Sequence, residues 1–145
     1  MEELIAKMKV VLASTFAIYL KTHNFHWNVE GPNFFSHHKF LQKLYEDYFD
    51  AVDRIAEEIR TLGAYAPGSF VRFKEDSVVE DEINIPSALS MMTKLREDNM
   101  KIIKILKDTQ KLAEKENAIG LANFLQDRVD VHYKHDWMLR SITKA

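Results

Sequence analysis

The sequence predicts an all-α protein that folds as a single domain over residues 1–145. Its 145 residues include only four Gly and three Pro, whereas a barrel or a sandwich would need many turn residues. Hydrophobic residues make up 46% of the chain, and many of them recur at helical steps of three and four. A chain of this length can bury a substantial core. We therefore expect a few long helices packed around one core.

The first two helices are predicted on either side of a Gly-Pro-Asn break at residues 31–33. The first runs from Glu2 to about Asn28, and the second ends at Leu62, with Gly63 as its stop signal. Five positions of the first helix share one face: Leu12, Phe16, Tyr19, His23 and His26. In the second helix, five apolar positions recur at helical spacing: Leu41, Tyr45, Val52, Ile55 and Ile59. The chain turns back at the break, so these helices should be antiparallel.

A long connection separates the second helix from the third. Residues 64–85 show no periodicity of helical length, although one short helix is expected near Ser69 to Lys74. A third helix begins at Pro86 or Ser87, and a fourth follows a weak break at Glu116-Asn117. A crossover between the second and third helices makes those two helices parallel. The sequence therefore predicts a ferritin-like four-helix bundle.

The absence of cysteine excludes a disulfide scaffold, a thiol nucleophile and a metal site built on cysteine. Without cysteine, any metal must be held by His, Asp and Glu. Residues 1–20 contain Lys7 and Lys9 within an amphipathic pattern, which resembles neither a signal peptide nor a membrane span. We therefore expect a cytoplasmic protein with no membrane partner. The formal charge of −2 gives no general attraction for nucleic acid.

Candidate metal ligands on the second helix lie too far apart to share one ion within a chain. Asp53 and Glu57 are spaced i,i+4, so their carboxylates share one face. His38 lies fifteen residues before Asp53, a rise of about 22 Å. The Glu-x-x-His motif of di-iron bundles is absent from the sequence. If two copies of this helix pack antiparallel about a two-fold axis, the His38 end of one meets the carboxylates of the other, and the site belongs to a dimer.

Several segments carry a family resemblance. HWNVEGPNF at residues 26–34, followed by His38 and by DRIAE at residues 53–57, resembles the Dps proteins, the mini-ferritins also called DNA-binding proteins from starved cells. The similarity extends to AYAPGS at 64–69 and to DVHYKHDWMLRS at 130–141. The resemblance implies a hollow dodecamer built from two-fold dimers. Such a shell would oxidise Fe(II) with hydrogen peroxide or O2, store ferric mineral and protect against oxidative stress.

The resemblance also implies a set of site residues. His26 and His38 of one subunit, with Asp53 and Glu57 of its two-fold mate, would be the iron ligands. Trp27 would lie beside the site, where it would supply an electron or intercept radicals. Zinc accepts the same types of ligand and is a candidate competitor.

One ligand position departs from the family pattern. Four residues after the second histidine the family usually has Asp or Glu, and this chain has Gln42. A Gln carbonyl oxygen brings no negative charge, so a second iron should be held more weakly. Glu46 lies one turn further, about 5 Å along the helix axis, which disfavours it as a substitute. The alternative hypothesis is a non-catalytic or weakly metal-binding shell or DNA-coating protein.

The remaining histidines have structural interpretations. We expect His23 to be a structural residue that orients a neighbour. For His132 and His135, at i,i+3 and flanked by aspartates, a solvated face is favoured over a secondary metal site. Trp137 and the pair Met91-Met92 are expected to be packing residues.

Binding of DNA through a tail is not expected. Dps proteins that bind DNA often do so through a flexible Lys-rich tail. Here the first helix begins at once with Glu2-Glu3, and the sequence ends at Ile142–Ala145. Clustered Lys and Arg supply most non-specific affinity for DNA, so we expect little binding.

Overall fold

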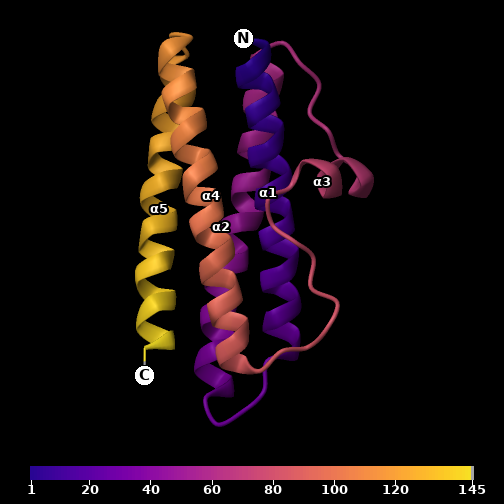
Figure 1. Ribbon diagram of the computed structural model, residues 1–145, viewed down its shortest axis with the longest axis vertical. Helices are drawn as coiled ribbons and strands as arrows, with labels where there is room; N and C mark the ends of the chain where they lie inside the picture. The colour runs from indigo at the N-terminus through magenta and orange to yellow at the C-terminus, as the bar shows by residue number, and fades with distance from the viewer. Residues whose placement is uncertain (145) are drawn as a thin grey trace.

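A computed structural model describes residues 1–144, which form a bundle of four long helices (Figure 1). The long helices are α1 (Glu2–Asn28), α2 (Phe34–Thr61), α4 (Ala88–Lys115) and α5 (Ile119–Thr143). The short helix α3 (Phe70–Asp76) lies in the connection between α2 and α4. The predicted all-α bundle with a short crossover helix is confirmed.

The bundle consists of two antiparallel helix pairs. Helix α1 packs against α2, and α4 packs against α5, while α1 also contacts α4 and α3. The crossover leaves the end of α2 beside the N-terminus, passes through α3 and reaches the opposite end of the bundle before α4 begins (Figure 1). Helices α2 and α4 therefore run in the same direction, as the crossover predicts.

Two helices end in the same hydrogen-bonded turn. After α2, the N–H of Gly63 donates to the carbonyl of Arg60, and the N–H of Ala64 donates to that of Ile59. Gly63 has a φ of +91°, which glycine adopts without the steric penalty of a side chain. This is a Schellman motif, and Asn117, with a φ of +59°, ends α4 in the same way. Gly63 and Asn117 thus end their helices because each adopts a positive φ.

Two helices begin with serine caps. The hydroxyl of Ser69 accepts a hydrogen bond from the Arg72 N–H at 3.3 Å, and the hydroxyl of Ser87 accepts one from the Ser90 N–H at 3.2 Å. These bonds satisfy N–H groups that have no carbonyl partner in the first turn of α3 and α4. The predicted starts of both helices therefore have a local physical cause.

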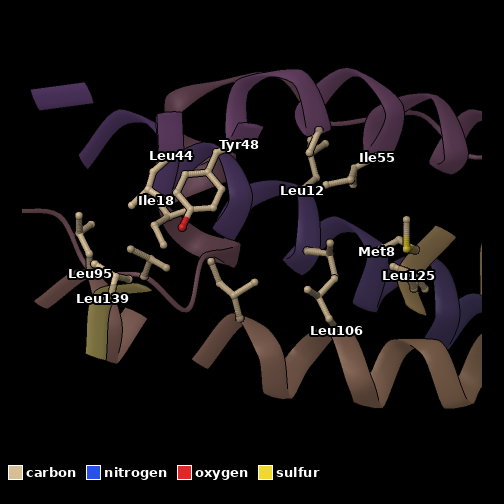
Figure 2. Close-up of a cluster of buried hydrophobic side chains, with 14 of the residues drawn as sticks. Met8, Leu12, Ile18, Leu44, Tyr48, Ile55, Leu95, Leu106, Leu125 and Leu139 are labelled. Carbon is tan, nitrogen blue, oxygen red and sulfur yellow. The ribbon is translucent and has the colours of Figure 1, made fainter. Parts of the chain in front are cut away.

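The core follows the bundle axis between the four long helices. Figure 2 shows side chains from all four meeting there, including Leu12 of α1, Ile55 of α2, Leu106 of α4 and Leu125 of α5. Met91 and Met92 are fully buried, as expected for packing residues. Trp137 was expected to pack, but it is 54% exposed. None of the helices within residues 1–144 is long and apolar enough to cross a bilayer.

Candidate metal centre

The turn between α1 and α2 brings two histidines together. His26 lies in the last turn of α1, and His38 lies near the start of α2. Gly31 has a φ of +124° in the intervening turn, a conformation that L side chains rarely adopt. The Gly-Pro break therefore reverses the chain and places the two imidazoles side by side, with ring centroids 3.7 Å apart.

A pair of crossed hydrogen bonds orients the two rings. Nδ1 of His26 lies 2.8 Å from the backbone carbonyl oxygen of His38, and Nδ1 of His38 lies 2.8 Å from that of His26. Because a carbonyl oxygen only accepts, each Nδ1 must carry the proton and donate it. In the neutral form of each ring Nε2 is then unprotonated, which is how metal-binding histidines are held. The rings are nearly parallel, with an angle of 15° between their planes.

Asp53 and Glu57 form a pair of exposed carboxylates further along α2. The pKa of Glu57 is raised above its ordinary value, because its carboxyl lies within hydrogen-bonding reach of Asp53 and the two negative charges repel each other. A cation placed between the carboxylates would remove this repulsion. The predicted sharing of one helix face is therefore observed.

The two pairs do not meet within one chain. Helix α2 is continuous from Phe34 to Thr61, so His38 and Asp53 lie about 22 Å apart along its axis. Over the described range 1–144, no group of three or more His, Asp and Glu side chains converges on a point that could hold a metal ion. A single chain thus carries two candidate half-sites.

Gln42 is held by its neighbour. Its side-chain amide donates to Glu46 Oε1 at 2.9 Å, one turn along α2. The free acceptor of Gln42 is then its carbonyl oxygen, a neutral ligand for a cation. The carboxylate of Glu46 is correspondingly drawn toward Gln42.

Trp27 and His23 extend the histidine pair into an aromatic cluster. The indole of Trp27 is 59% exposed, and its ring lies 4.3 Å from that of His23. His23 stacks on Tyr45 with ring centroids 3.9 Å apart, and its Nδ1 is 3.0 Å from the Tyr19 hydroxyl. Partial burial, and next the proximity of His26, lower the pKa of His23. His23 therefore links Trp27 to two tyrosines.

The two histidines of α5 lie inside the bundle, which corrects the expectation of a solvated face. His132 is 1% exposed and His135 is 6% exposed. Nδ1 of His132 lies 2.7 Å from Asn99 Oδ1, and its Nε2 lies 3.2 Å from the guanidinium of Arg128. Arg128 donates two hydrogen bonds to the carboxylate of Asp47, from Nη1 to Oδ1 and from Nη2 to Oδ2, each at 2.9 Å. The i,i+3 spacing of His132 and His135 placed both on one face of α5, but it did not show that this face is turned toward α2 and α4.

This internal cluster carries its own cation. Arg128 neutralises Asp47, and it also disfavours a positive charge on His132, whose pKa lies well below its ordinary value through burial and the charge of Arg128. A metal ion would have to displace the guanidinium. The interior of the bundle is therefore occupied by a structural polar network, and the half-sites on α1 and α2 are the candidates for metal chemistry.

Comparisons with known proteins identify the family of this chain. The family model described as a ferritin-like domain matches residues 5–145. A low temperature-induced protein of Nostoc sp. is 34% identical over 136 residues, covering 92% of this chain and 76% of the relative. The DNA protection during starvation protein of Brevibacillus brevis is 29% identical over 131 residues, covering 90% of this chain and 87% of that protein.

A solved structure shows the same fold. The crystal structure of Dps from Staphylococcus aureus superimposes on this chain with a TM-score of 0.96 at 29% identity, covering all of this chain and 97% of the other. The similarity includes the crossover and both helix pairs, because it extends over the whole chain. Together with the family match, it shows that this chain belongs to the Dps family of ferritin-like proteins.

Proposed function

We propose that the protein is a ferroxidase and iron-storage mini-ferritin, which oxidises Fe(II) with hydrogen peroxide or O2 and stores the ferric product. The crossed hydrogen bonds of His26 and His38 are the observation that carries this proposal. They fix the tautomer of both rings and leave an unprotonated Nε2 on each neutral ring for metal binding. Neutral imidazole binds Fe(II), and carboxylate oxygens favour Fe(III) once it forms.

The complete site is formed by two chains. Antiparallel packing of two α2 helices about a two-fold axis brings the histidine pair of one chain to Asp53 and Glu57 of the other. The repulsion between these carboxylates, expressed in the raised pKa of Glu57, would be relieved by a bound cation. Gln42 would add a neutral oxygen, so the second iron position would be the weaker one. Zinc, which takes the same ligand types, would compete for the site.

An exposed apolar surface supports the shared site. An open pocket of about 560 Å³ lies between α1, α3 and the crossover, and its lining includes Phe16, Leu20 and Phe70. Leu20 is 40% exposed and Phe70 is 80% exposed. Exposed apolar side chains that gather on one face are typical of interaction surfaces. We propose that this face packs in a two-fold dimer and that dimers assemble into a hollow dodecamer in the cytoplasm.

Gln42 also supports an alternative function. A site that lacks one carboxylate could bind iron or zinc only loosely, and the protein would then act as a non-catalytic shell or DNA coat. The two functions differ in the rate of Fe(II) oxidation. If ultraviolet absorbance after addition of Fe(II) and peroxide rises no faster than in buffer, the alternative replaces the ferroxidase.

A complementation experiment tests the shared site. The variants His26→Ala and Asp53→Ala should each be nearly inactive, because each lacks a ligand in every site. When the two are unfolded together and co-assembled, half of the dimers should be mixed, and each mixed dimer contains one intact site. Random pairing therefore predicts recovery of roughly a quarter of wild-type sites.

The control is Asp127→Ala, which removes an exposed carboxylate of α5 and should leave activity unchanged. Mass spectrometry verifies the mixing of subunits. Fully mixed shells that remain as inactive as their parents would rule out a site shared between chains.

A further inference from the structure

Two tyrosines contact His23, and only one of them is hydrogen-bonded to it. The Tyr19 hydroxyl lies 3.0 Å from Nδ1 of His23, with ring centroids 5.6 Å apart. Tyr45 stacks on the face of His23 with ring centroids 3.9 Å apart, whereas Nδ1 of His23 faces the Tyr19 hydroxyl. Trp27 covers His23 as well, at 4.3 Å. His23 is thus a bridge between an exposed indole and a phenol that is already hydrogen-bonded to a base.

This difference decides which tyrosine is easier to oxidise. A phenol that loses an electron becomes a strong acid, so its oxidation is favoured when a neighbouring base takes the proton at the same time. In the tautomer of His23 that carries its proton on Nε2, Nδ1 accepts from Tyr19. Tyr45 stacks on the ring face of His23 with 9° between the ring planes, so its hydroxyl does not face Nδ1, although its ring is the closer of the two. Proximity alone would favour Tyr45, whereas proton transfer favours Tyr19.

We propose that Tyr19 is a one-electron donor to the oxidation site, connected to it through Trp27, and that His23 is the positioning residue that accepts its proton. This inference rests on the proposed ferroxidase function. Trp27 follows His26 directly in the sequence, so the donor chain begins beside a predicted iron ligand. It ends in a half-buried tyrosine, where a radical is shielded from solvent.

The electron count of the reaction gives this donor a role. Hydrogen peroxide takes up two electrons, whereas one Fe(II) supplies one. Because Gln42 weakens the second iron position, a site that holds a single Fe(II) is short of one electron. Trp27 supplies that electron, and Tyr19 then reduces the Trp27 radical while its hydroxyl proton passes to Nδ1 of His23.

The reaction balances in atoms and charge. One H2O2, one Fe(II), one Tyr19 hydroxyl, one neutral His23 and two protons yield one Fe(III), one tyrosyl radical, one protonated His23 and two water molecules. A later Fe(II) returns an electron to Tyr19, and the proton held by His23 goes back to restore the phenol. Both electrons of peroxide reduction are then drawn from iron, although the site holds one iron at a time.

A metal-free experiment tests the donor chain independently of iron chemistry. In the Trp137→Phe background Trp27 is the only tryptophan, because the chain has two. Azide radicals made by pulse radiolysis oxidise tryptophan faster than neutral tyrosine. We expect the visible band of the tryptophan radical to decay while the narrow tyrosyl band grows at the same rate, independent of protein concentration. Adding Trp27→Phe measures the direct oxidation of tyrosine, which is subtracted.

Three further variants assign the pathway. Tyr19→Phe should lose the tyrosyl band, whereas the matched control Tyr45→Phe should retain it. His23→Phe keeps an aromatic ring beside Trp27 but removes the proton acceptor, so the tryptophan radical should persist and the tyrosyl yield should fall. A tyrosyl band that survives in Tyr19→Phe, or one that is lost in Tyr45→Phe, would overturn the assignment. An unchanged yield in His23→Phe would overturn the role of His23.

An iron experiment tests the role in turnover. One Fe(II) per site followed by peroxide should produce a tyrosyl electron paramagnetic resonance signal in the wild type and none in Tyr19→Phe. No signal in the wild type would overturn the donor role in turnover. The two proposals fail separately, because the metal-free transfer does not require Fe(II) oxidation. Loss of ferroxidase activity with intact radical transfer would refute only the proposed function.

Discussion

His26 and His38 each use Nδ1 to hold a backbone carbonyl of the other residue, which leaves Nε2 unprotonated in the neutral ring. The backbone carbonyls of His26 and His38 are the acceptors, so the arrangement depends on helix ends as much as on side chains. A substitution that preserved the ring positions but altered the turn would therefore disturb the tautomers. Gly31, with its positive φ, is the residue on which the turn most directly depends.

The Gln42→Glu variant tests the proposal that Gln42 makes the second iron position the weaker one. The added carboxylate brings a negative charge at nearly unchanged size, so we expect tighter binding of Fe(II) or Zn²⁺ by calorimetry. Without metal, the new carboxylate would repel Glu46, which now accepts from the Gln42 amide at 2.9 Å. Gln126→Glu makes the same change on an exposed position of α5 and should leave affinity unaltered. Equal or weaker binding in Gln42→Glu would show that this side chain lies outside the metal site.

The buried His135 predicts a dependence of stability on pH. Burial lowers its pKa from 6.5 to about 4, although Asp47 opposes the shift. The unfolded chain therefore binds a proton below pH 6.5 that the folded chain does not bind until about pH 4. The stabilising contribution is complete above pH 6.5 and is lost as pH falls toward 4, on the order of 3 kcal/mol in all.

Chemical denaturation across this pH range measures the effect. The His135→Gln variant cannot take up the proton, so its free energy of unfolding should fall less steeply between pH 6.5 and 4 than that of the wild type. Protein concentration must be held constant, because assembly contributes to apparent stability. Parallel pH profiles in the two proteins would contradict the prediction.

At the scale of helices, the crossover is held against the bundle by α1. The hydroxyl of Ser14 accepts from the Val78 N–H at 3.0 Å, and the ammonium of Lys21 donates to the Glu80 carbonyl at 3.0 Å. Lys21 also forms an ion pair with Asp98 of α4 at 2.8 Å, with both side chains less than 10% exposed. One lysine thus connects α1, α4 and the crossover.

The Lys21–Asp98 pair should show strong coupling between its two substitutions. Lys21→Met leaves the carboxylate of Asp98 buried without a partner, and its pKa is already raised by burial. Removing one partner of a buried pair typically costs about 3–5 kcal/mol. The double variant Lys21→Met/Asp98→Leu should recover most of that loss, because no charge is left buried. Urea unfolding of the wild type, the two single variants and the double variant gives the four free energies of a double-mutant cycle. Losses of stability that simply add would contradict the coupling.

At the scale of the whole molecule, the charge balance argues against DNA binding. The formal charge is −2, and non-specific affinity for DNA comes mainly from phosphate neutralisation by clustered Lys and Arg. We expect no retardation of DNA in a gel shift at physiological salt and sub-micromolar protein. A variant with an appended Lys-rich tail serves as the positive control. Retardation by the unmodified protein would reveal a basic surface and contradict this prediction.

Much of the fold follows from local sequence. The periodicity of apolar residues marked the four long helices, and the serine caps and the Gly63 and Asn117 stops marked their ends to within a few residues. These signals are readable because they depend on neighbours in the chain: a cap bonds to an N–H three residues away, and a Schellman turn closes within six residues. The parallel arrangement of α2 and α4 followed from the length of the crossover.

The tertiary structure decided what each helix face contacts. Periodicity groups His132 with His135 and leaves Trp137 on an adjacent position, but it does not reveal which face meets α2 and α4. The histidines are buried beside Arg128, which lies one turn earlier on α5, and Trp137 remains exposed. The crossed bonds of His26 and His38 and the link from Tyr19 to His23 likewise depend on the packing of α1 against α2 or on the rotamers chosen there. The chain's own order determined where helices form, whereas burial and hydrogen-bond partners were set by contacts between residues distant in sequence.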